Sequence, residues 1–299
     1  MTRLQKILTI IAGFAFLLCA ISYLPFFSQR AAPRAFQSAL LNSSYKDEVN
    51  EIVIDSGGKQ IRLTRHLSDW TVADGVALIP AEGKLAENLL HNVIKLRKMY
   101  TISDTSMGTS EPFLSVLFGN GSNMYTKVDF FKINSLTNRI SFSLEGKPEV
   151  YECEDDFSHY LQSDLAYWAR PSLIQLLSNP VAFIWQEEGE KIRTFAENSE
   201  FFDKKKHDLM VLRHGLLLSP DAAGESPSDE AARLTVSDVN ANSEIISFLP
   251  LKDGSFRCEY RWIFLSTDGR GADIADDLHF AYEISAWTYR RLREIFTLD

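Results

Sequence analysis

The sequence predicts an α+β protein, in which an N-terminal transmembrane helix precedes two tandem antiparallel-sheet-plus-helix modules. Three observations lead to this fold class: an uncharged apolar run near the start, short apolar strands separated by glycine-containing turns, and a later return of the same order of elements. The 299 residues suffice for two domains of about 150 residues each. The expected organisation is a cytoplasmic tip and anchor at 1–30, a linker at 31–48, a first module at 49–178, and a second module at 179–299 with a polar loop at about 219–243.

The apolar run from 7 to 27 has the length of about 20 residues that a helix needs to cross a bilayer. Arg3 and Lys6 precede it, and aromatic residues lie near its far end, as in an interfacial belt. A cleaved signal peptide is the alternative, but Pro33 follows the small residues that would mark the cut and disfavours it. Positive residues flank both ends, so charge alone does not orient the helix. Its place at the start of the chain favours a single-pass anchor in the inner membrane, with the bulk of the chain in the periplasm.

Turn and periodicity signals define the elements of the first module. Gly57 and Gly58 separate two apolar strands, which indicates a tight hairpin, and Asn120-Gly121 gives the same signal further on. Between 80 and 99, apolar residues recur every three or four positions, as on one face of a helix. The expected elements are a hairpin of 49–55 with 60–64, a strand at 69–72, a helix within 80–99, strands at 113–118 and 125–131, a hairpin of 139–146 with 149–153, and a helix at 155–168.

The second module shows similar signals. Gly189 and Gly254 stand at hairpin turns, and a helix is expected to end at Gly215, since glycine commonly terminates helices. The stretch 219–243 is rich in Ser, Pro, Asp and Ala, which is typical of a long loop. The expected elements are a hairpin across 181–195, a helix across 200–215, a hairpin across 244–264, a strand at 278–285 and a helix at 286–296.

Five landmarks recur in the same order at a nearly constant offset, which indicates a duplicated module rather than a solenoid. The alternative is that hairpin-helix-hairpin patterns are common in α+β proteins. The offsets are 132 from Val49 to Val181, 130 from Phe118 to Phe248, 133 from Gly121 to Gly254, and 131 from both Tyr151 to Tyr282 and Leu161 to Leu292.

Charge and cysteine content narrow the function classes. The net charge of −9 argues against a nucleic-acid binder, and the short run Lys204–Lys206 is typical of a solvated helix face. There is no Cys-x-x-Cys pair, so a structural zinc site is not expected. Cys153 and Cys258 are a candidate disulfide outside the cytoplasm; the alternative is two buried thiols.

Motifs of catalysis are absent from the sequence. Ser56 and Lys59 have the spacing of a Ser-x-x-Lys pair, but they stand in a hairpin turn rather than on a helix. No phosphate-binding loop, dinucleotide fingerprint, nucleophile elbow or His-Glu-x-x-His helix occurs. The chain has two Asp-Asp pairs, at 155–156 and 276–277. Neighbouring residues do not face each other on a helix, so neither pair is expected to act in acid-base catalysis. We therefore expect no catalytic, cofactor-binding or metal-binding residues, no cofactor, and no enzyme activity.

Aromatic and arginine residues near the ends of the two modules form a candidate interface, because these residue types are enriched in binding hot spots. The alternative is that helices pack on their sheets while the basic side chains reach solvent. The candidate residues are Tyr167, Trp168, Arg170, Trp287, Tyr289, Arg290 and Arg291.

Residues 45–175 resemble the domain of unknown function family 4340. The resemblance lies in the hairpin-and-Trp stretch "VNEIVIDSGGKQIRLTRHLSDWTV", in "AENLLHNVIKLRKM", and in the later "LSVLFGNGSNMYTKVDFF" and "DLAYWARPSL". The basic-then-apolar N-terminus also fits. The chain lacks a clear Gly-Leu-x-x-Pro step before the strand at 114–118, where "GTSEPF" stands instead.

The resemblance implies a bacterial protein anchored by one helix and associated with ABC-type transporters of gliding-motility or auxiliary export systems; it implies no catalytic residues. The expected function is thus a non-catalytic, membrane-anchored accessory or scaffold subunit of such a complex, held in the membrane by residues 7–27 and in contact with the membrane subunits of the transporter. The alternatives are an envelope scaffold or carbohydrate-binding module without a transporter partner and, less favoured, a hydrolase of envelope polymers.

Overall fold

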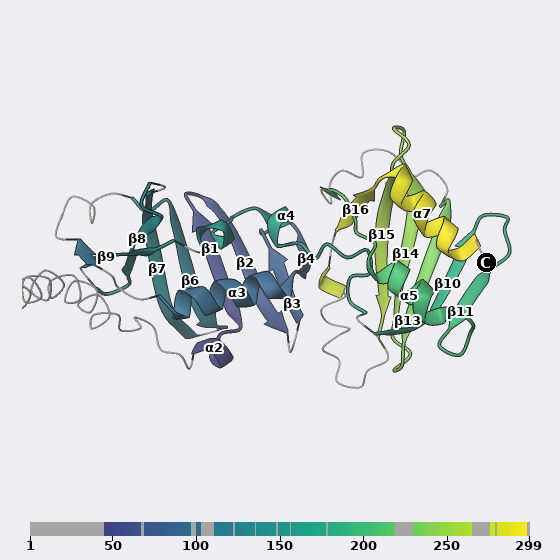
Figure 1. Ribbon diagram of the computed structural model, residues 1–299, viewed down its shortest axis with the longest axis horizontal. Coiled ribbons are helices and arrows are strands. Elements are labelled where there is room, and N and C mark those ends of the chain that lie inside the picture. The colour runs from purple at the N-terminus through teal and green to yellow at the C-terminus, as the bar shows by residue number, and fades with distance from the viewer. Residues whose placement is uncertain are drawn as a thin grey trace, which may run out of the picture.

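The chain contains two antiparallel sheets, each with its helices on one side, as the ribbon diagram of the computed structural model shows (Figure 1). The predicted α+β class with two modules is therefore confirmed. The structure describes residues 45–66, 69–96, 100–102, 111–121, 123–134, 136–147, 149–155, 157–177, 179–218, 230–264, 276–278 and 280–297. The predicted anchor at 7–27 and most of the linker at 31–48 lie outside these residues. Among the residues that are described, no helix is long and apolar enough to cross a membrane.

The first sheet has nine strands in the order β4-β3-β2-β1-β6-β7-β8-β9-β5. Its alternate residues Ile52, Ile54, Val116 and Phe118 are fully or almost fully buried beneath the helical side. The elements are α2 (Tyr45–Glu48), β1 (Glu51–Ser56), β2 (Lys59–His66), β3 (Asp69–Ala73), β4 (Leu78–Ala81), α3 (Gly83–Ile94), β5 (Tyr100–Ile102), β6 (Leu114–Asn120), β7 (Asn123–Asn134), β8 (Arg139–Leu144), β9 (Val150–Glu154), the 3₁₀ turn η2 (Ser158–Tyr160) and α4 (Leu165–Trp168).

The second sheet has seven strands in the order β11-β10-β13-β14-β15-β16-β12. Its buried face is made by Phe183, Trp185, Leu234, Ile246 and Phe248, which pack with residues of α5 and α7 in one core. The elements are β10 (Pro180–Glu187), β11 (Arg193–Ala196), α5 (Phe202–Met210), β12 (Leu217–Leu218), β13 (Ala232–Asp238), β14 (Ser243–Pro250), β15 (Phe256–Ile263), β16 (Ala281–Ile284) and α7 (Ala286–Thr297).

The two sheets share one strand order once β3 and β4 are set aside. Strands β2-β1-β6-β7-β8-β9-β5 correspond in turn to β11-β10-β13-β14-β15-β16-β12, with α3 matching α5 and α4 matching α7 in chain order. The constant offset, however, is wrong in the middle of the modules. Phe118 lies in β6, whereas Phe248 lies in β14, which corresponds to β7; the Gly121 and Gly254 turns are likewise not equivalent. Because β3 and β4 lengthen the first module and the β15–β16 connection lengthens the second, the offset varies along the chain.

The predicted polar loop at 219–243 is wrong over its second half, since β13 occupies Ala232–Asp238. Ala232, Leu234 and Val236 are buried and alternate with more exposed neighbours. This is the period-two pattern of a strand, which the polar composition of the stretch obscured.

Two predicted helices are shorter in the structure. The helix expected at 155–168 is the turn η2 followed by the one-turn helix α4, because Asp164 caps a new start by accepting from the Ala166 amide. The helix expected to end at Gly215 ends at Met210 instead. Residues 212–214 pair with a neighbouring extended segment, which takes them out of the helix.

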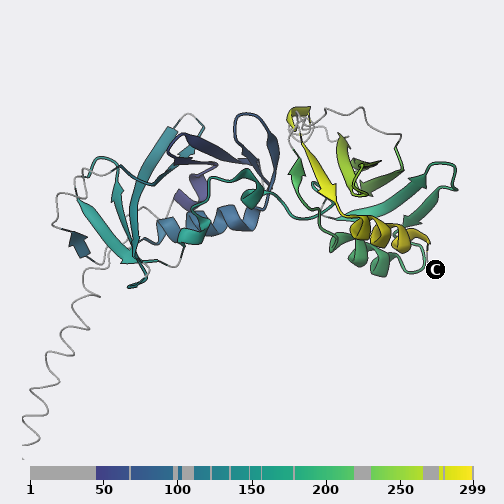
Figure 2. The same cartoon turned by 90° about the horizontal axis from the view of Figure 1, so that it is seen from above.

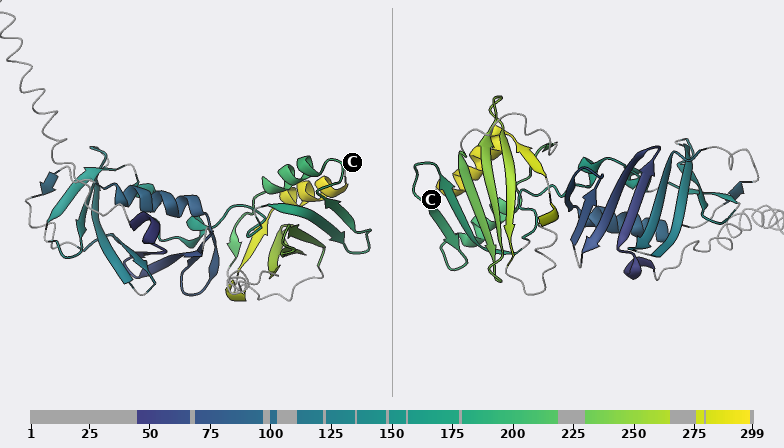
Figure 3. Two further views of the ribbon diagram at one scale, coloured as in Figure 1. Left: turned by 90° about the horizontal axis from the view of Figure 1, so that it is seen from below. Right: turned by 180° about the vertical axis from the view of Figure 1, so that it is seen from behind.

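Helices α3, α5 and α7 lie on the same side of the molecule, and none of these three covers the opposite side of either sheet (Figures 2 and 3). The uncovered side of the first sheet carries ion pairs such as Arg62–Glu51 and Lys127–Asp129 beside apolar residues such as the paired Val53 and Leu117. Antiparallel sheets commonly have one solvated face of this kind.

The candidate disulfide between Cys153 and Cys258 is not formed. Cys153 is buried in the first core and Cys258 in the second, and neither is joined by a disulfide. The alternative of two buried thiols therefore describes them. Burial raises the pKa of the Cys258 thiol well above its ordinary value, because the apolar surroundings disfavour the thiolate.

Candidate functional site

A groove of about 770 Å³ lies where the two modules meet. Its apolar lining comes from Trp70 of β3, Met210 of α5, and Ile174 and Leu177 of the extended segment 169–177, which we call the connector. Its polar lining includes Asp69, Lys84, Glu87, Asn88 and Arg170. An apolar concavity with a few polar groups is the usual form of a ligand or peptide site.

The connector is bonded to β4, an edge strand of the first sheet, and to residues 212–214 of the second module. On one side, the Arg170 amide donates to the carbonyl of Pro80 in β4 at 3.0 Å. On the other side, the Leu173 amide donates to the Leu212 carbonyl at 2.9 Å and the His214 amide to the Pro171 carbonyl at 3.2 Å. The Arg170 bond lies at the edge strand β4, where backbone groups would otherwise lack partners. The second core also begins within the connector, at Leu173, and thus before the expected module boundary at 179.

Arg170 ties the connector to both modules. Its guanidinium lies 2.8 Å from the carboxylate of Asp69 in β3, and it also donates to the backbone carbonyl of Gln175. Its own carbonyl contacts the His214 ring, which stacks on Tyr282 with ring centroids 3.5 Å apart. Burial lowers the pKa of His214, because the charged imidazolium loses solvation there.

Glu244 holds the far end of the connector. Its carboxylate is fully buried and accepts from three successive backbone amides, those of Gln175 at 2.7 Å, Leu176 at 2.9 Å and Leu177 at 3.3 Å. Desolvation raises the pKa of Glu244 even though these bonds act in the opposite direction. The carboxylate therefore fixes the segment that supplies Ile174 and Leu177 to the groove.

A second network fixes the lining contributed by the first module. Glu87 of α3 accepts from Arg65 at 2.5 Å and from the Trp70 indole at 3.1 Å, and the Arg65 guanidinium lies 4.8 Å from the Trp70 ring centroid. Gly83 allows α3 to approach, because a Cβ atom there would lie 3.2 Å from the Trp70 ring. The indole is thus held against the start of the helix.

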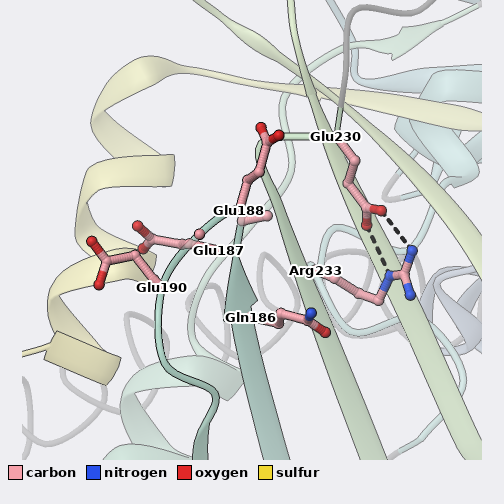
Figure 4. A pocket seen from close by; sticks show the side chains of 8 residues that line it. Gln186, Glu187, Glu188, Glu190, Glu230 and Arg233 are labelled. Atoms are coloured by element: carbon pink, nitrogen blue, oxygen red, sulfur yellow. Dashed lines mark hydrogen bonds and ion pairs between the residues drawn. The ribbon is translucent and has the colours of Figure 1, made fainter.

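A smaller pocket of about 370 Å³ lies beside the β10–β11 turn (Figure 4). Two of its four carboxylates are engaged: Glu230 receives two hydrogen bonds from Arg233, and Glu187 pairs with Arg293 at 2.8 Å. The hydrogen bonds and charge of Arg233 lower the pKa of Glu230 despite the opposing effect of burial. In the described part of the chain, no group of three or more His, Cys, Asp or Glu side chains could hold a metal ion.

The candidate interface residues do not form one patch. Trp168 is buried in the first core and donates to the Gln162 carbonyl, and Tyr167 packs edge-on against it. Tyr289 packs against the second core, stacked on Phe256 at 3.8 Å, and burial raises its pKa to about 12. Arg170 lies at the groove. Exposed side chains are Trp287, Arg290 and Arg291, all on α7.

Sequence reasoning missed Glu244 and Gln175. A signal for Glu244 was present, since it falls on the same alternate positions as Ile246 and Phe248 and so belongs to the buried face of β14. Its acceptance of three connector amides depends on residues about 70 positions earlier. No local pattern reveals such a contact.

No protein-family model, no curated protein and no solved structure matches this chain. The resemblance of residues 45–175 to family 4340 therefore stays a prediction, and the function has to be argued from geometry.

We expect that Arg170→Ala loosens the connector at little cost in global stability. The Asp69 partner is about half exposed, and such ion pairs contribute about 1 kcal/mol or less. The lost bond to the Gln175 carbonyl should instead accelerate hydrogen exchange at the amides of 171–177, measured by mass spectrometry. Arg62→Ala, which breaks an ion pair on the uncovered sheet face, is the matched control. Equal exchange in wild type and Arg170→Ala would show that this arginine does not hold the connector.

Proposed function

We propose that this chain is a non-catalytic, membrane-anchored accessory or scaffold subunit of an ABC-type transport or gliding-type envelope complex, and that it holds its partner in the groove between its modules. The observation that carries the proposal is the groove itself, whose lining is contributed by both modules and fixed by Arg170 and Glu244. A lining held by buried hydrogen bonds lowers the entropy that a partner loses on binding.

The partner class comes from the family resemblance, and the binding mode comes from the groove. The lining combines the half-buried Met210 and the almost fully buried Trp70 and Ile174 with the charged groups of Lys84 and Arg170. This combination suits an extended protein segment with alternating apolar and polar side chains. We also propose that the modules arose by duplication, which their shared strand order supports.

Affinity purification of the full-length protein from mild-detergent membranes tests this function. We expect transporter subunits to co-purify with the wild type, and their recovery to fall at least tenfold with Lys84→Glu combined with Met210→Gln. Lys84 is exposed and Met210 is half-buried, so both changes alter the groove more than the core. The matched control is Lys95→Glu, an exposed position at the other end of α3.

The other outcomes are distinct. A protein that purifies alone from several detergents contradicts the accessory-subunit proposal. Equal recovery with the groove variant and with Lys95→Glu contradicts the groove as the contact. Release of soluble sugars from envelope polymers by the purified chain contradicts the non-catalytic assignment.

A further inference from the structure

The helical layer of the second module, α5 with the residues around it and α7, differs in charge from the rest of the chain. Residues 201–214 and 286–297 contain seven Lys and Arg against three Asp and Glu, a net charge of +4, whereas the whole chain carries −9. The rest of the chain therefore carries −13, so the layer is a basic region on an acidic protein. Such asymmetry indicates a partner that is itself anionic.

Several of these cations are free to meet such a partner. Lys204, Arg213 and Arg290 are exposed and form no ion pair with any residue that the structure describes. The neighbouring cations have structural roles: Lys205 is buried and donates to the Ile295 carbonyl at 2.7 Å, and Arg293 pairs with Glu187. The run Lys204–Lys206, which the sequence suggested was a solvated helix face, is therefore only partly solvated, because Lys204 is exposed and Lys205 is buried.

The same layer exposes large apolar side chains. Trp287 is 68% exposed at the start of α7, Phe201 is 57% exposed just before α5, and Val211 is 56% exposed just after it. Phe201 also adopts a φ of 62°, a conformation that costs free energy for an aromatic residue and is found where the surrounding structure or function requires it. Burial of these three side chains against a partner would be favourable.

The geometry of the two helices places the exposed Lys204, Trp287 and Arg290 on one surface. Helices α5 and α7 lie side by side on the same face of the second sheet, and Lys205 bonds directly to the C-terminal turn of α7 (Figures 2 and 3). The buried residues of both helices face the sheet, namely Phe202 and Leu209 of α5 and Leu292 and Phe296 of α7. Their exposed residues consequently point away from the sheet.

We propose that this helical layer docks on an anionic membrane surface. Exposed aromatic and aliphatic side chains beside unpaired Lys and Arg are the features by which amphipathic helices lie in the headgroup region of acidic lipids. A soluble anionic polymer could bind the Lys and Arg side chains, but unlike a membrane it offers no apolar layer in which Trp287 and Phe201 could be buried. This contact is separate from the groove. It would give the chain a second attachment to the bilayer, through the second module, in addition to the N-terminal anchor.

Tryptophan fluorescence can test this docking. The sequence has five tryptophans; Trp287 is 68% exposed, Trp70, Trp168 and Trp185 are buried, and Trp262 is partly buried. Full-length protein is mixed with or inserted into nanodiscs that contain brominated phosphatidylglycerol, because bromine quenches tryptophan at the bilayer. We expect brominated phosphatidylglycerol to quench the fluorescence of the wild type, and to quench that of Trp287→Phe at least twofold less. Brominated phosphatidylcholine, which has no net charge, should not quench the wild type.

Charge variants separate this surface from the rest of the chain. Lys204→Glu with Arg290→Glu should abolish most of the quenching, whereas Arg261→Glu, an exposed arginine on the opposite face of the sheet, should leave it unchanged. All these positions are exposed, and far-ultraviolet circular dichroism confirms that each variant is folded.

Equal quenching in wild type and Trp287→Phe, or none in wild type with anionic discs, would overturn the proposal. Binding to soluble polyphosphate without lipid quenching would overturn it in favour of a polymer. The quenching can also be measured with protein added from solution. A negative result would therefore contradict membrane docking by the helical layer without contradicting the N-terminal anchor or the groove.

Discussion

Glu244→Ala is expected to lower the free energy of unfolding of the second module by about 3–5 kcal/mol, since three buried backbone amides lose their acceptor at once. Neither water nor a neighbouring side chain replaces the carboxylate at a fully buried position without rearrangement. The loss should be accompanied by faster hydrogen exchange at the amides of Gln175, Leu176 and Leu177. Urea unfolding followed by circular dichroism measures the stability change.

Glu259→Ala is the matched control, because this carboxylate is exposed on the adjacent strand β15 and its loss should change stability by about 0.5 kcal/mol or less. If Glu244→Ala changes stability as little as Glu259→Ala does, the buried carboxylate does not hold the connector.

The raised pKa of Glu244 gives this site a characteristic pH dependence. The folded protein binds the carboxyl proton more tightly than the unfolded chain, whose ordinary pKa is 4.5. The contribution of this linkage to stability is therefore fully present below that ordinary value and is lost as pH rises through the raised, folded-state pKa. We expect the stability of the wild type relative to Glu244→Gln to fall across that interval. A difference that stays constant from pH 4 to pH 8 would contradict this assignment.

Trp185→Ala is expected to destabilise the second module by about 3–5 kcal/mol, the usual cost of truncating a buried tryptophan. Trp185 is 1% exposed, stacks on Phe296 with ring centroids 5.3 Å apart, and also packs against Phe248 and Tyr289. Its indole donates to Glu187 at 2.9 Å, so truncation removes a hydrogen bond as well as packing. These contacts all belong to the second module.

The effect should be confined to that module, because the two hydrophobic cores are largely separate. Hydrogen exchange monitored by mass spectrometry distinguishes them: peptides from β10, β13 and β14 should lose protection, whereas peptides from β1 and β6 should keep it. Ile263→Ala, at a side chain that is 41% exposed on β15, controls for a small change in the same sheet. Equal loss of protection in β1 would mean that the modules unfold as one unit.

The sequence by itself determined the hairpins, the principal helices and the presence of two modules. These features depend on local causes: Gly57, Gly189 and Gly254 adopt the positive φ values that their turns require, and the apolar period of α3 builds one buried face. Strand β13 was also accessible from its alternation, although its polar neighbours concealed it. Turn conformation and helix periodicity depend on residues only a few positions apart, so they can be predicted from the sequence directly.

Only the tertiary structure decided where the cysteines lie, where the aromatic residues gather and what forms the groove. Trp168 and Tyr289 pack in different modules, and Cys153 and Cys258 belong to different cores. The groove depends on contacts between residues far apart in the chain, such as Asp69 with Arg170 and Glu244 with Gln175. The chain folds so that a carboxylate within an apolar strand meets the amides of the connector, and the energy of such a contact depends on burial and direction, which sequence spacing does not encode.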